Sequence, residues 1–471
     1  MSSVSSALSS LLSGSTSSSS IDLTSILQAA LGASSPGIDV TSAVNAAVSA
    51  ARAPETAWEN QISYLQSQSS AISQLNTSLS SLDTDTQNLN SITGSLSART
   101  VSSSNSAVVT ASAASGSTPG NHVIVVTNLA STASWTSGVF ANGTTALPAG
   151  SFTVTTGTGA GTITTDGTQT LTDVASQING DNLGLTASVV TDATGSRLAI
   201  VANASGAPAN FTVAGDAGFG FAQAATGTNA SLTVDGISIS SASNTVTGAV
   251  PGLTLNLQSA DPGVQISLGV SQDVSSATSA INQFVTDYNS IISSLNTQFT
   301  YTAGVGEGVL STDSSVRTLQ TQLLSMLSYT YSPSSGTTTM PNLSSMGITV
   351  NNDGTLTVNS STLQSSLQNN FNDVQSFFQG NALNGFANSL DQTLTSYTNA
   401  GNGAFTVDLQ SISSQETDLN TSINNFETNY ITPLKAQLTS EYSQAEILLQ
   451  QLPTEMKQID AELGNNNNNS N

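Results

Sequence analysis

The feature that most constrains the fold is a heptad repeat between residues 58 and 92. Two series of positions spaced seven apart define it: Leu65, Ile72, Leu79 and Thr86, and then Gln68, Leu75, Leu82 and Leu89. Six of these eight positions are apolar, which predicts a long helix packed as in a coiled coil. The remaining positions are mostly Ser, Thr, Gln and Asn, which favour helices weakly. The helix should therefore depend on a partner for its stability.

A second heptad tract lies near the other end of the chain, between residues 407 and 459. Apolar residues recur every seven positions before Pro433, and an apolar stripe continues after it through Leu438, Tyr442, Ala445, Leu449 and Leu452. Each tract is marginal as an isolated helix. We therefore expect the two tracts to pair, which brings the two terminal regions of the chain together.

The stretch between the tracts has the period of β-strands. Alternating Val, Ile and Thr residues with Gly and Pro between them run through residues 107–271. The segment "SASNTVTGAVPGLTLNL" (241–257) predicts a strand, a Pro-Gly turn and a second strand. One short helix, "TLTDVASQINGDNLG", is predicted within this region, with Thr170 or Thr172 as its cap.

These patterns predict an α+β, discontinuous multidomain protein. A helical coiled-coil stalk is built from both termini, and a mainly β region of one or two lobes is inserted into it. The expected boundaries are 1–40 and 441–471 for partly disordered terminal helical leg segments, 41–106 and 272–440 for the stalk with a small hairpin, and 107–271 for the β insert, with an inner lobe at about 107–144 and 228–271 and an outer lobe at about 145–227.

Composition excludes several classes of function. The 471-residue chain has a net charge of −23, and its six basic residues are scattered, which argues against binding to nucleic acid or to an anionic membrane. The absence of cysteine excludes thiolate catalysis, disulfides and cysteine-based metal sites. No stretch reaches the ~18 apolar residues of a membrane span. The N-terminal segment lacks the pattern of a cleavable signal peptide, so export would use another route.

The candidate chemical groups have simpler structural interpretations. His122 is the only histidine, and the sequence offers it no triad or ligand partners nearby. Asp83 and Asp85 fall inside the heptad helix and lack the pattern of a calcium loop. The Gly-rich stretch 304–309 is read as a flexible connection, and Trp58 as a packing anchor, while Trp135 in the insert could contact a sugar. We predict no catalytic, cofactor-binding or metal-binding residue and no enzymatic activity.

Four stretches together resemble the flagellar filament-capping protein family, also called flagellar hook-associated protein 2. They are Gly37–Leu82, "LTDVASQINGDNLGLTASVVTDATGSRLAIVA" (Leu171–Ala202), "SLTVDGISISSASNTVTGAVPGLTLNL" (Ser231–Leu257), and the pair "AINQFVTDYNSIISSLN" and "GVLSTDSSVRTLQTQLLSML". The resemblance covers roughly residues 30 to 460, and the order of the motifs carries more weight than any one of them. The match at Ser231–Leu257 disfavours flagellin and the hook–filament junction protein.

The resemblance implies an extracellular structural protein at the tip of the bacterial flagellum, exported by the flagellar type III system without a cleaved signal peptide. Its expected partners are other copies of itself in a ring, as a pentamer or hexamer, and flagellin, which would fold and join the filament beneath the ring. Hook–filament junction proteins and an export chaperone are further possible partners. No cofactor, nucleic acid or membrane insertion is expected. The alternative function is a surface adhesin whose β insert binds host or matrix glycans.

The apolar heptad positions are the candidate assembly residues. They are Leu65, Ile72, Leu75, Leu79 and Leu82 in the first tract, and Leu438, Tyr442, Leu449 and Leu452 in the second. The sequence leaves open which of them pack within one subunit and which contact another.

Overall fold

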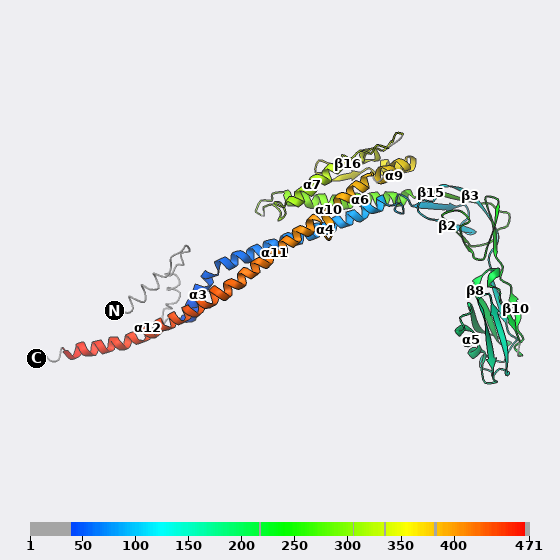
Figure 1. Cartoon of the computed structure of the whole chain (residues 1–471), viewed down its shortest axis with the longest axis horizontal. Helices are drawn as coiled ribbons and strands as arrows, with labels where there is room; N and C mark the ends of the chain where they lie inside the picture. Colours follow the sequence, from blue (N-terminus) through cyan, green and yellow to red (C-terminus); the bar gives the residue numbers. More distant parts are fainter. Residues whose placement is uncertain (1–38, 216–217, 305, 334–335, 381–383, 467–471) are drawn as a thin grey trace. The chain divides into compact units, whose positions relative to one another are not determined.

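The computed structural model describes residues 39–466, except for 216–217, 305, 334–335 and 381–383 (Figure 1). Almost all of the predicted leg segment 1–40, and the tail after residue 466, lie outside the described residues. The chain forms two compact units. One holds the residues up to Leu79, Ser294–Gln320 and the residues from Thr395 onward; the other holds Ser80–Ser293 and Thr321–Leu394. Terminal helices flank a β-rich middle, so the predicted α+β class is confirmed.

Long helices build the first unit. Those that lie wholly within it are α3 (Val40–Ala51), α11 (Ala404–Phe426) and α12 (Thr432–Asn466), and it shares with the second unit α4 (Ala53–Asn90), α6 (Val274–Phe299), α7 (Ser314–Met326) and α10 (Phe386–Thr398). The heptad repeat thus predicts α4 almost to its ends.

The start of α3 and the break before α4 follow from local chemistry. Asp39 caps α3: its carboxylate accepts hydrogen bonds from the Ser42 N–H at 3.1 Å and the Ser42 hydroxyl at 2.6 Å. Arg52 ends α3, and α4 begins at the next residue. Pro54 lies in the first turn of α4, where a missing N–H breaks no helical hydrogen bond. The proline therefore separates two helices instead of kinking one.

A short π-helical segment, η3 (Glu427–Ile431), joins α11 to α12. Pro433 lies just after it and has no N–H to donate to the carbonyl four residues earlier. A local change of helical hydrogen bonding lets the chain continue as a helix through this position.

In the second unit, the helical part contains a small hairpin and an aromatic core. Its remaining elements are η2 (Ser344–Met346), β16 (Ile348–Val350), β17 (Leu356–Val358), α8 (Ser360–Asn369) and α9 (Phe371–Gln379). The hairpin predicted from "MGITVNNDGTLTVN" is confirmed by antiparallel pairing of β16 with β17. Phe377 on α9 stacks on Phe386 of α10 at 5.3 Å between ring centroids, and Phe284 of α6 meets Phe386 edge-on at 5.9 Å.

The strands form two lobes with separate cores, and every pairing within their sheets is antiparallel. The first lobe has a five-stranded sheet in the order β1-β15-β3-β11-β12 and a three-stranded sheet in the order β13-β14-β2. Its strands are β1 (Arg99–Ser103), β2 (Val109–Ala113), β3 (Gly120–Asn128), β11 (Ala230–Val234), β12 (Ile237–Ser241), β13 (Thr245–Thr247), β14 (Leu253–Leu257) and β15 (Ile266–Gln272). The predicted strand–turn–strand at 241–257 is confirmed as β13 and β14.

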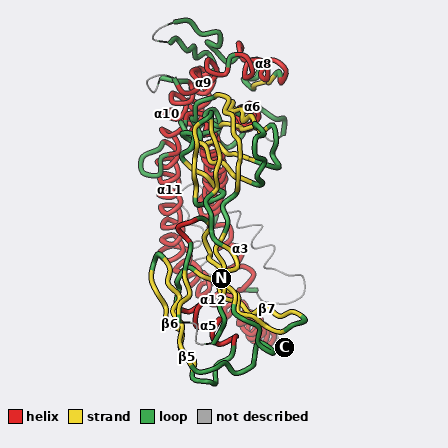
Figure 2. Tube along the Cα trace, turned by 90° about the vertical axis from the view of Figure 1, so that its right-hand side faces the viewer, coloured by secondary structure: helices red, strands yellow, loops and turns green. Residues whose placement is uncertain are grey.

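The second lobe has sheets in the orders β10-β4-β8-β7 and β6-β5-β9, and α5 packs into its core (Figure 2). Its elements are β4 (Thr132–Thr136), β5 (Gly150–Thr156), β6 (Gly159–Thr165), α5 (Leu171–Gly180), β7 (Leu185–Asp192), β8 (Gly195–Ser205), η1 (Ala207–Ala209), β9 (Thr212–Ala214) and β10 (Ala222–Ala225). Thr170 caps α5 in a capping box with Asp173, as one of the two predicted alternatives.

Two predicted boundaries differ from those of the structure. The first strand begins at Arg99, not near residue 107, and pairs along its length with β15. The chain passes into the second lobe between Ala130, in the first core, and Ala133, in the second, whereas the predicted crossing is at about 144. Strand alternation looks the same in both lobes, so periodicity cannot locate a crossing between them. The return crossing lies between β10 and β11, near the expected residue 228.

Candidate assembly surface

Small and apolar residues bring α3 against α12, and the two helices lie side by side (Figure 1). Ala43, Val44 and Val48 of α3 are buried in one cluster with Ile431 and Tyr442. Partly buried residues of the same cluster include Phe426 and Leu438. The alanine and valine side chains allow the helices to approach closely, and Tyr442 contributes a large apolar area. Burial raises the pKa of the Tyr442 phenol, with a smaller contribution from Glu441.

A second set of contacts joins the start of α4 to the end of α11. The Trp58 and Phe426 rings meet edge-to-face at 5.6 Å between centroids, and Phe426 stacks on Tyr430 at 5.1 Å. Arg52 forms ion pairs with both Glu55 and Glu427. Trp58 is thus a packing anchor, as expected. The contact of Trp58 with Phe426 shows that the two heptad tracts meet in the first unit.

The five predicted assembly residues of the first tract are buried within one chain. Leu65, Ile72, Leu75, Leu79 and Leu82 are at most 6% exposed. A neighbouring subunit could reach them only if the helical packing opened. Their burial favours the alternative in which they form the core of one subunit.

The two polar heptad positions are satisfied by backbone carbonyls. Gln68 donates to the Val309 carbonyl at 3.0 Å, and the buried Thr86 hydroxyl donates to the Leu82 carbonyl one turn earlier at 2.7 Å. Tyr64 also donates to the Val309 carbonyl, at 3.2 Å. This end of the Gly-rich stretch 304–309 is therefore fastened to α4; residue 305 lies outside the described residues.

The predicted residues of the second tract divide along α12. Tyr442 is buried and Leu438 is half-buried, both in the cluster with α3. Leu449 and Leu452 are half-buried, and neither belongs to that cluster. The structure therefore brings Leu438 and Tyr442 together with α3 and leaves the last two on a separate part of the helix.

Beyond Tyr442, α12 carries a surface that we call the terminal apolar face: Leu448, Leu449, Leu452, Met456 and Ile459. Met456 is 62% exposed and Ile459 54%. Ala445, Leu449, Leu452, Met456 and Ile459 continue the three–four spacing of a heptad stripe. Leu448, Met456 and Ile459 are not among the predicted assembly residues, although this spacing would have indicated the last two.

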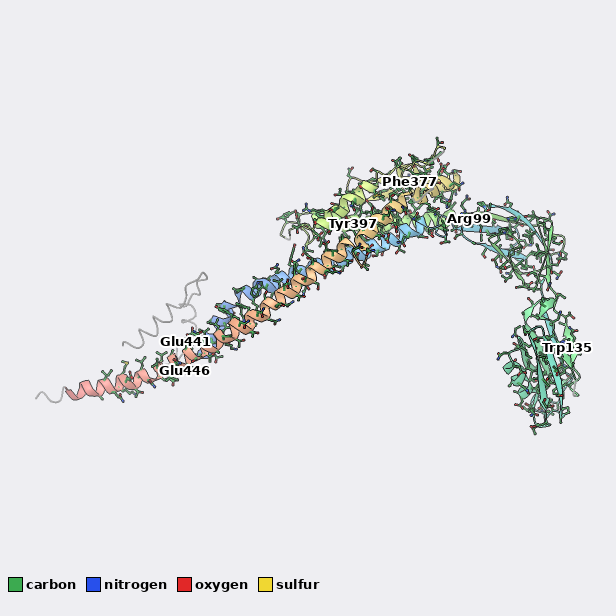
Figure 3. All side chains as sticks on the ribbon, viewed as in Figure 1. Arg99, Trp135, Phe377, Tyr397, Glu441 and Glu446 are labelled. Carbon is green, nitrogen blue, oxygen red and sulfur yellow. The ribbon has the colours of Figure 1, made fainter. Side chains whose placement is uncertain are left out.

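Acidic side chains lie beside this face. Glu441 and Glu446 project from α12 (Figure 3) and accept hydrogen bonds from Gln437 and Gln450, at 2.8 and 3.1 Å. Each bond joins residues four apart on the helix, which supports the helix locally. Pro453 lies inside α12, yet the helix continues through it to Asn466. None of the described helices is long and apolar enough to cross a membrane.

Other groups singled out in the sequence have structural partners. His122 Nδ1 lies 2.8 Å from Asp235 Oδ2, and the other Asp235 carboxylate oxygen accepts the Val123 N–H. The hydrogen bond with His122 is the main cause that lowers the pKa of Asp235. Trp135 on β4 (Figure 3) is half-buried, and its indole N–H donates to the Phe211 carbonyl at 3.0 Å. In the part of the chain that the structure describes, no three His, Asp or Glu residues are grouped to hold a metal ion.

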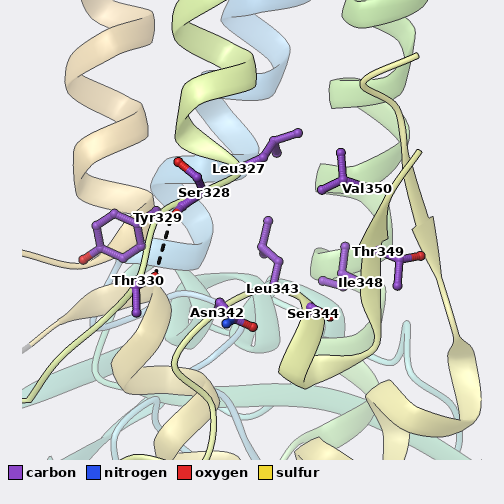
Figure 4. A pocket seen from close by; sticks show the side chains of 10 residues that line it. All are labelled: Leu327, Ser328, Tyr329, Thr330, Asn342, Leu343, Ser344, Ile348, Thr349 and Val350. Carbon is purple, nitrogen blue, oxygen red and sulfur yellow. Dashed lines mark hydrogen bonds between the residues drawn. The ribbon is translucent and has the colours of Figure 1, made fainter. Parts of the chain in front are cut away.

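A cavity of about 410 Å³ lies beside the hairpin strand β16 (Figure 4). Leu327, Leu343, Ile348 and Val350 provide its apolar lining, and hydroxyl and amide side chains provide the rest. The only ionisable side chain in its lining is the phenol of Tyr329.

Comparison with known proteins agrees with this architecture. Family models described as flagellar hook-associated protein 2 N-terminus and C-terminus match residues 36–133 and 227–454. A third, the flagellin hook IN motif, matches residues 151–204, which contain β5 through most of β8 with α5.

Two relatives and one solved structure illustrate the similarity. The A-type flagellar hook-associated protein 2 of Pseudomonas aeruginosa is 30% identical over 331 residues, covering 62% of this chain and 68% of that protein. The flagellar hook-associated protein 2 of Aeromonas caviae is 29% identical over 313 residues, covering 61% and 66%. The D1-D2-D3 domains of the Escherichia coli flagellar cap protein FliD match with 28% identity and a TM-score of 0.61, over 73% of this chain and 99% of that one.

Both the N-terminal and the C-terminal model of one family match in the expected order, and a flagellar cap protein has the same fold. The chain therefore belongs to the flagellar hook-associated protein 2 family of flagellar cap proteins.

Proposed function

We propose that this chain closes the distal end of the flagellar filament as a ring of identical subunits, retains flagellin, and assists its folding and insertion. The observation that carries the proposal is the terminal apolar face of α12. This face lies on α12 beyond Tyr442, where the cluster that packs α12 against α3 within one subunit ends. An exposed apolar surface of this kind is typical of a site of protein–protein contact.

Side chains of this face are still exposed to water in one chain. Full burial of a Met or Ile side chain contributes roughly 1.5–3 kcal/mol. Met456 and Ile459 are each more than half exposed, so contact with neighbouring subunits would bury area that the monomer leaves in water. In a ring, each copy would contribute this stabilisation, and the helical ends would act as legs at the filament tip.

The assembly role of the other terminal segment stays a prediction. Residues 1–40 contain the apolar segment "IDLTSILQAALG", and the chain enters α3 beside α12. We expect residues 1–40 and the end of α12 to pack fully only on assembly. For the C-terminal leg segment, predicted as 441–471, we propose a start after Tyr442, because Tyr442 belongs to the cluster with α3.

Export, location and further partners follow from the same proposal. The chain would pass unfolded through the flagellar type III channel and fold at the filament tip. The absence of cysteine agrees with this route, since no disulfide has to form outside the cell. Flagellin and other copies of this chain would be its direct partners, and junction proteins and an export chaperone would meet it transiently. The subunit number, five or six, is left to experiment.

Deletion and complementation in the bacterium that encodes the chain tests this function. We expect the deletion strain to release flagellin into the medium and to lose swimming, because exported flagellin is neither retained nor folded at the tip. Supplying the full chain should restore both. Flagellin levels in medium and cells, measured by immunoblot, separate loss of retention from loss of expression. Normal filaments and motility in the deletion strain would contradict the proposal.

A further inference from the structure

Aspartates on three helices form two facing pairs in the second unit. Asp83 and Asp85 lie on α4, Asp287 is the only charged residue of α6, and Asp391 is the only charged residue of α10. Charged residues make up just 7% of the chain. The single charges of α6 and α10 nevertheless both lie against the two acids of α4.

The geometry pairs these carboxyl groups across the helix contacts. Gln87 Nε2 lies 3.0 Å from both Asp83 Oδ2 and Asp391 Oδ1, and it donates to each, so one amide spans the first pair. Asp83 and Asp391 are within hydrogen-bonding reach of each other, and so are Asp85 and Asp287.

One oxygen of each α4 aspartate is buried. Within the described residues, the buried atoms Asp83 Oδ1 and Asp85 Oδ2 receive no hydrogen bond from an N–H or hydroxyl donor. A proton on one member of each pair is therefore the donor that would satisfy these oxygens. A carboxylic O–H would then donate to the facing carboxylate, as one short charge-assisted hydrogen bond per pair.

The three helices that carry these pairs supply no positive charge to balance them. None of α4, α6 or α10 contains Lys, Arg or His, and Tyr288, beside Asp287, is a buried phenol whose pKa burial raises. Burial, followed by the facing Asp391, raises the pKa of Asp83 to about 6. Burial, followed by the facing Asp287, raises the pKa of Asp85 to about 6. Two negative charges within hydrogen-bonding reach repel each other, which opposes ionisation of both members of a pair.

We propose that the pairs Asp83–Asp391 and Asp85–Asp287 form a proton-operated latch that holds α4 against α10 and α6. In acid, each pair keeps one proton shared between its two carboxyl groups. When the pH rises, that proton leaves for solvent, two carboxylates face each other, and the helix contacts loosen. Since the folded state binds these protons more tightly than the unfolded chain, the stabilisation is complete below pH 3.8 and is lost as the pH rises through about 6.

Thermal unfolding of the full chain at pH 5 and pH 7.5, followed by circular dichroism at the helical band, tests the latch. We expect the wild-type melting temperature to be higher at pH 5 by at least about 3 °C. Asp83→Asn with Asp85→Asn keeps the side-chain size, supplies an amide donor to each facing carboxylate, and should raise the melting temperature at pH 7.5. The difference between the two pH values should shrink by more than half.

Two further variants make the result specific. Acid also weakens the general repulsion in a chain of net charge −23, so Glu59→Gln with Asp418→Asn removes two exposed helical charges as a matched control and should keep the wild-type pH dependence. Asp287→Asn with Asp391→Asn removes the opposite halves of both pairs and should flatten the dependence as the α4 variant does. Equal wild-type stability at both pH values, or flattening by the control to the same extent, would overturn the latch.

Discussion

Deleting residues 447–471 is expected to abolish filament capping while leaving the melting temperature of the purified monomer nearly unchanged. The cluster that joins α12 to α3 ends at Tyr442, so the deletion keeps that packing. It removes the whole terminal apolar face, including the exposed Met456 and Ile459. In the complementation assay, flagellin should accumulate in the medium as it does without the chain.

Paired substitutions refine this test. Met456→Asp with Ile459→Asp places two charges on the terminal apolar face, and burial of an unpaired charge is strongly unfavourable. Thr454→Asp with Gln458→Asp adds the same charge to exposed positions on the opposite side of α12 and should preserve capping. An immunoblot of the medium must show that each variant is itself exported. Capping by the truncated chain, or a sharp fall in its melting temperature, would mean that this segment belongs to the core of the monomer.

Leu79→Asp is expected to have the largest effect on stability. Leu79 is fully buried on α4. Truncating a core leucine alone costs about 2–5 kcal/mol, and the unpaired carboxylate adds a desolvation penalty. The helical part should unfold at a lower temperature, whereas the two β lobes, which have separate hydrophobic cores, should persist.

Hydrogen–deuterium exchange of the full chain measures the two effects separately. Amides of α4 should lose protection in Leu79→Asp, and amides of β3 and β8 should keep it. Ser73→Asp, at an exposed position of α4, is the matched control and should leave both patterns unchanged. Unchanged protection throughout α4 in Leu79→Asp would contradict its assignment to the core.

Local patterns in the sequence predicted the elements whose causes are local. The heptad positions around Ile72 predicted α4, Thr170 predicted the cap of α5, and Asn-Asp-Gly predicted the turn between β16 and β17. Periodicity could not place the crossing between the lobes, because strands in both lobes alternate in the same way. It also could not show that Leu65 or Leu82 is buried within one chain, since an apolar heptad position looks the same in an intramolecular and an intermolecular contact.

The aspartate pairs illustrate a second limit of the sequence. Asp83 and Asp85 look like residues of a solvated helix face, and Asp287 and Asp391 are about 200 and 300 positions away along the chain. Only the packing of α4 with α6 and α10 brings the members of each pair together. Long-range polar contacts of this kind leave no periodic signal in one sequence.

Electron microscopy of the purified full chain tests the central claim most directly. A filament cap built from identical subunits should appear as closed rings or stacked plates with a fixed subunit number, and the same density should be found at the ends of filaments incubated with the chain. Rings should be absent for the protein that lacks residues 447–471 if the terminal apolar face joins the subunits. Particles that remain single at every concentration, and filament ends that stay bare, would contradict the account.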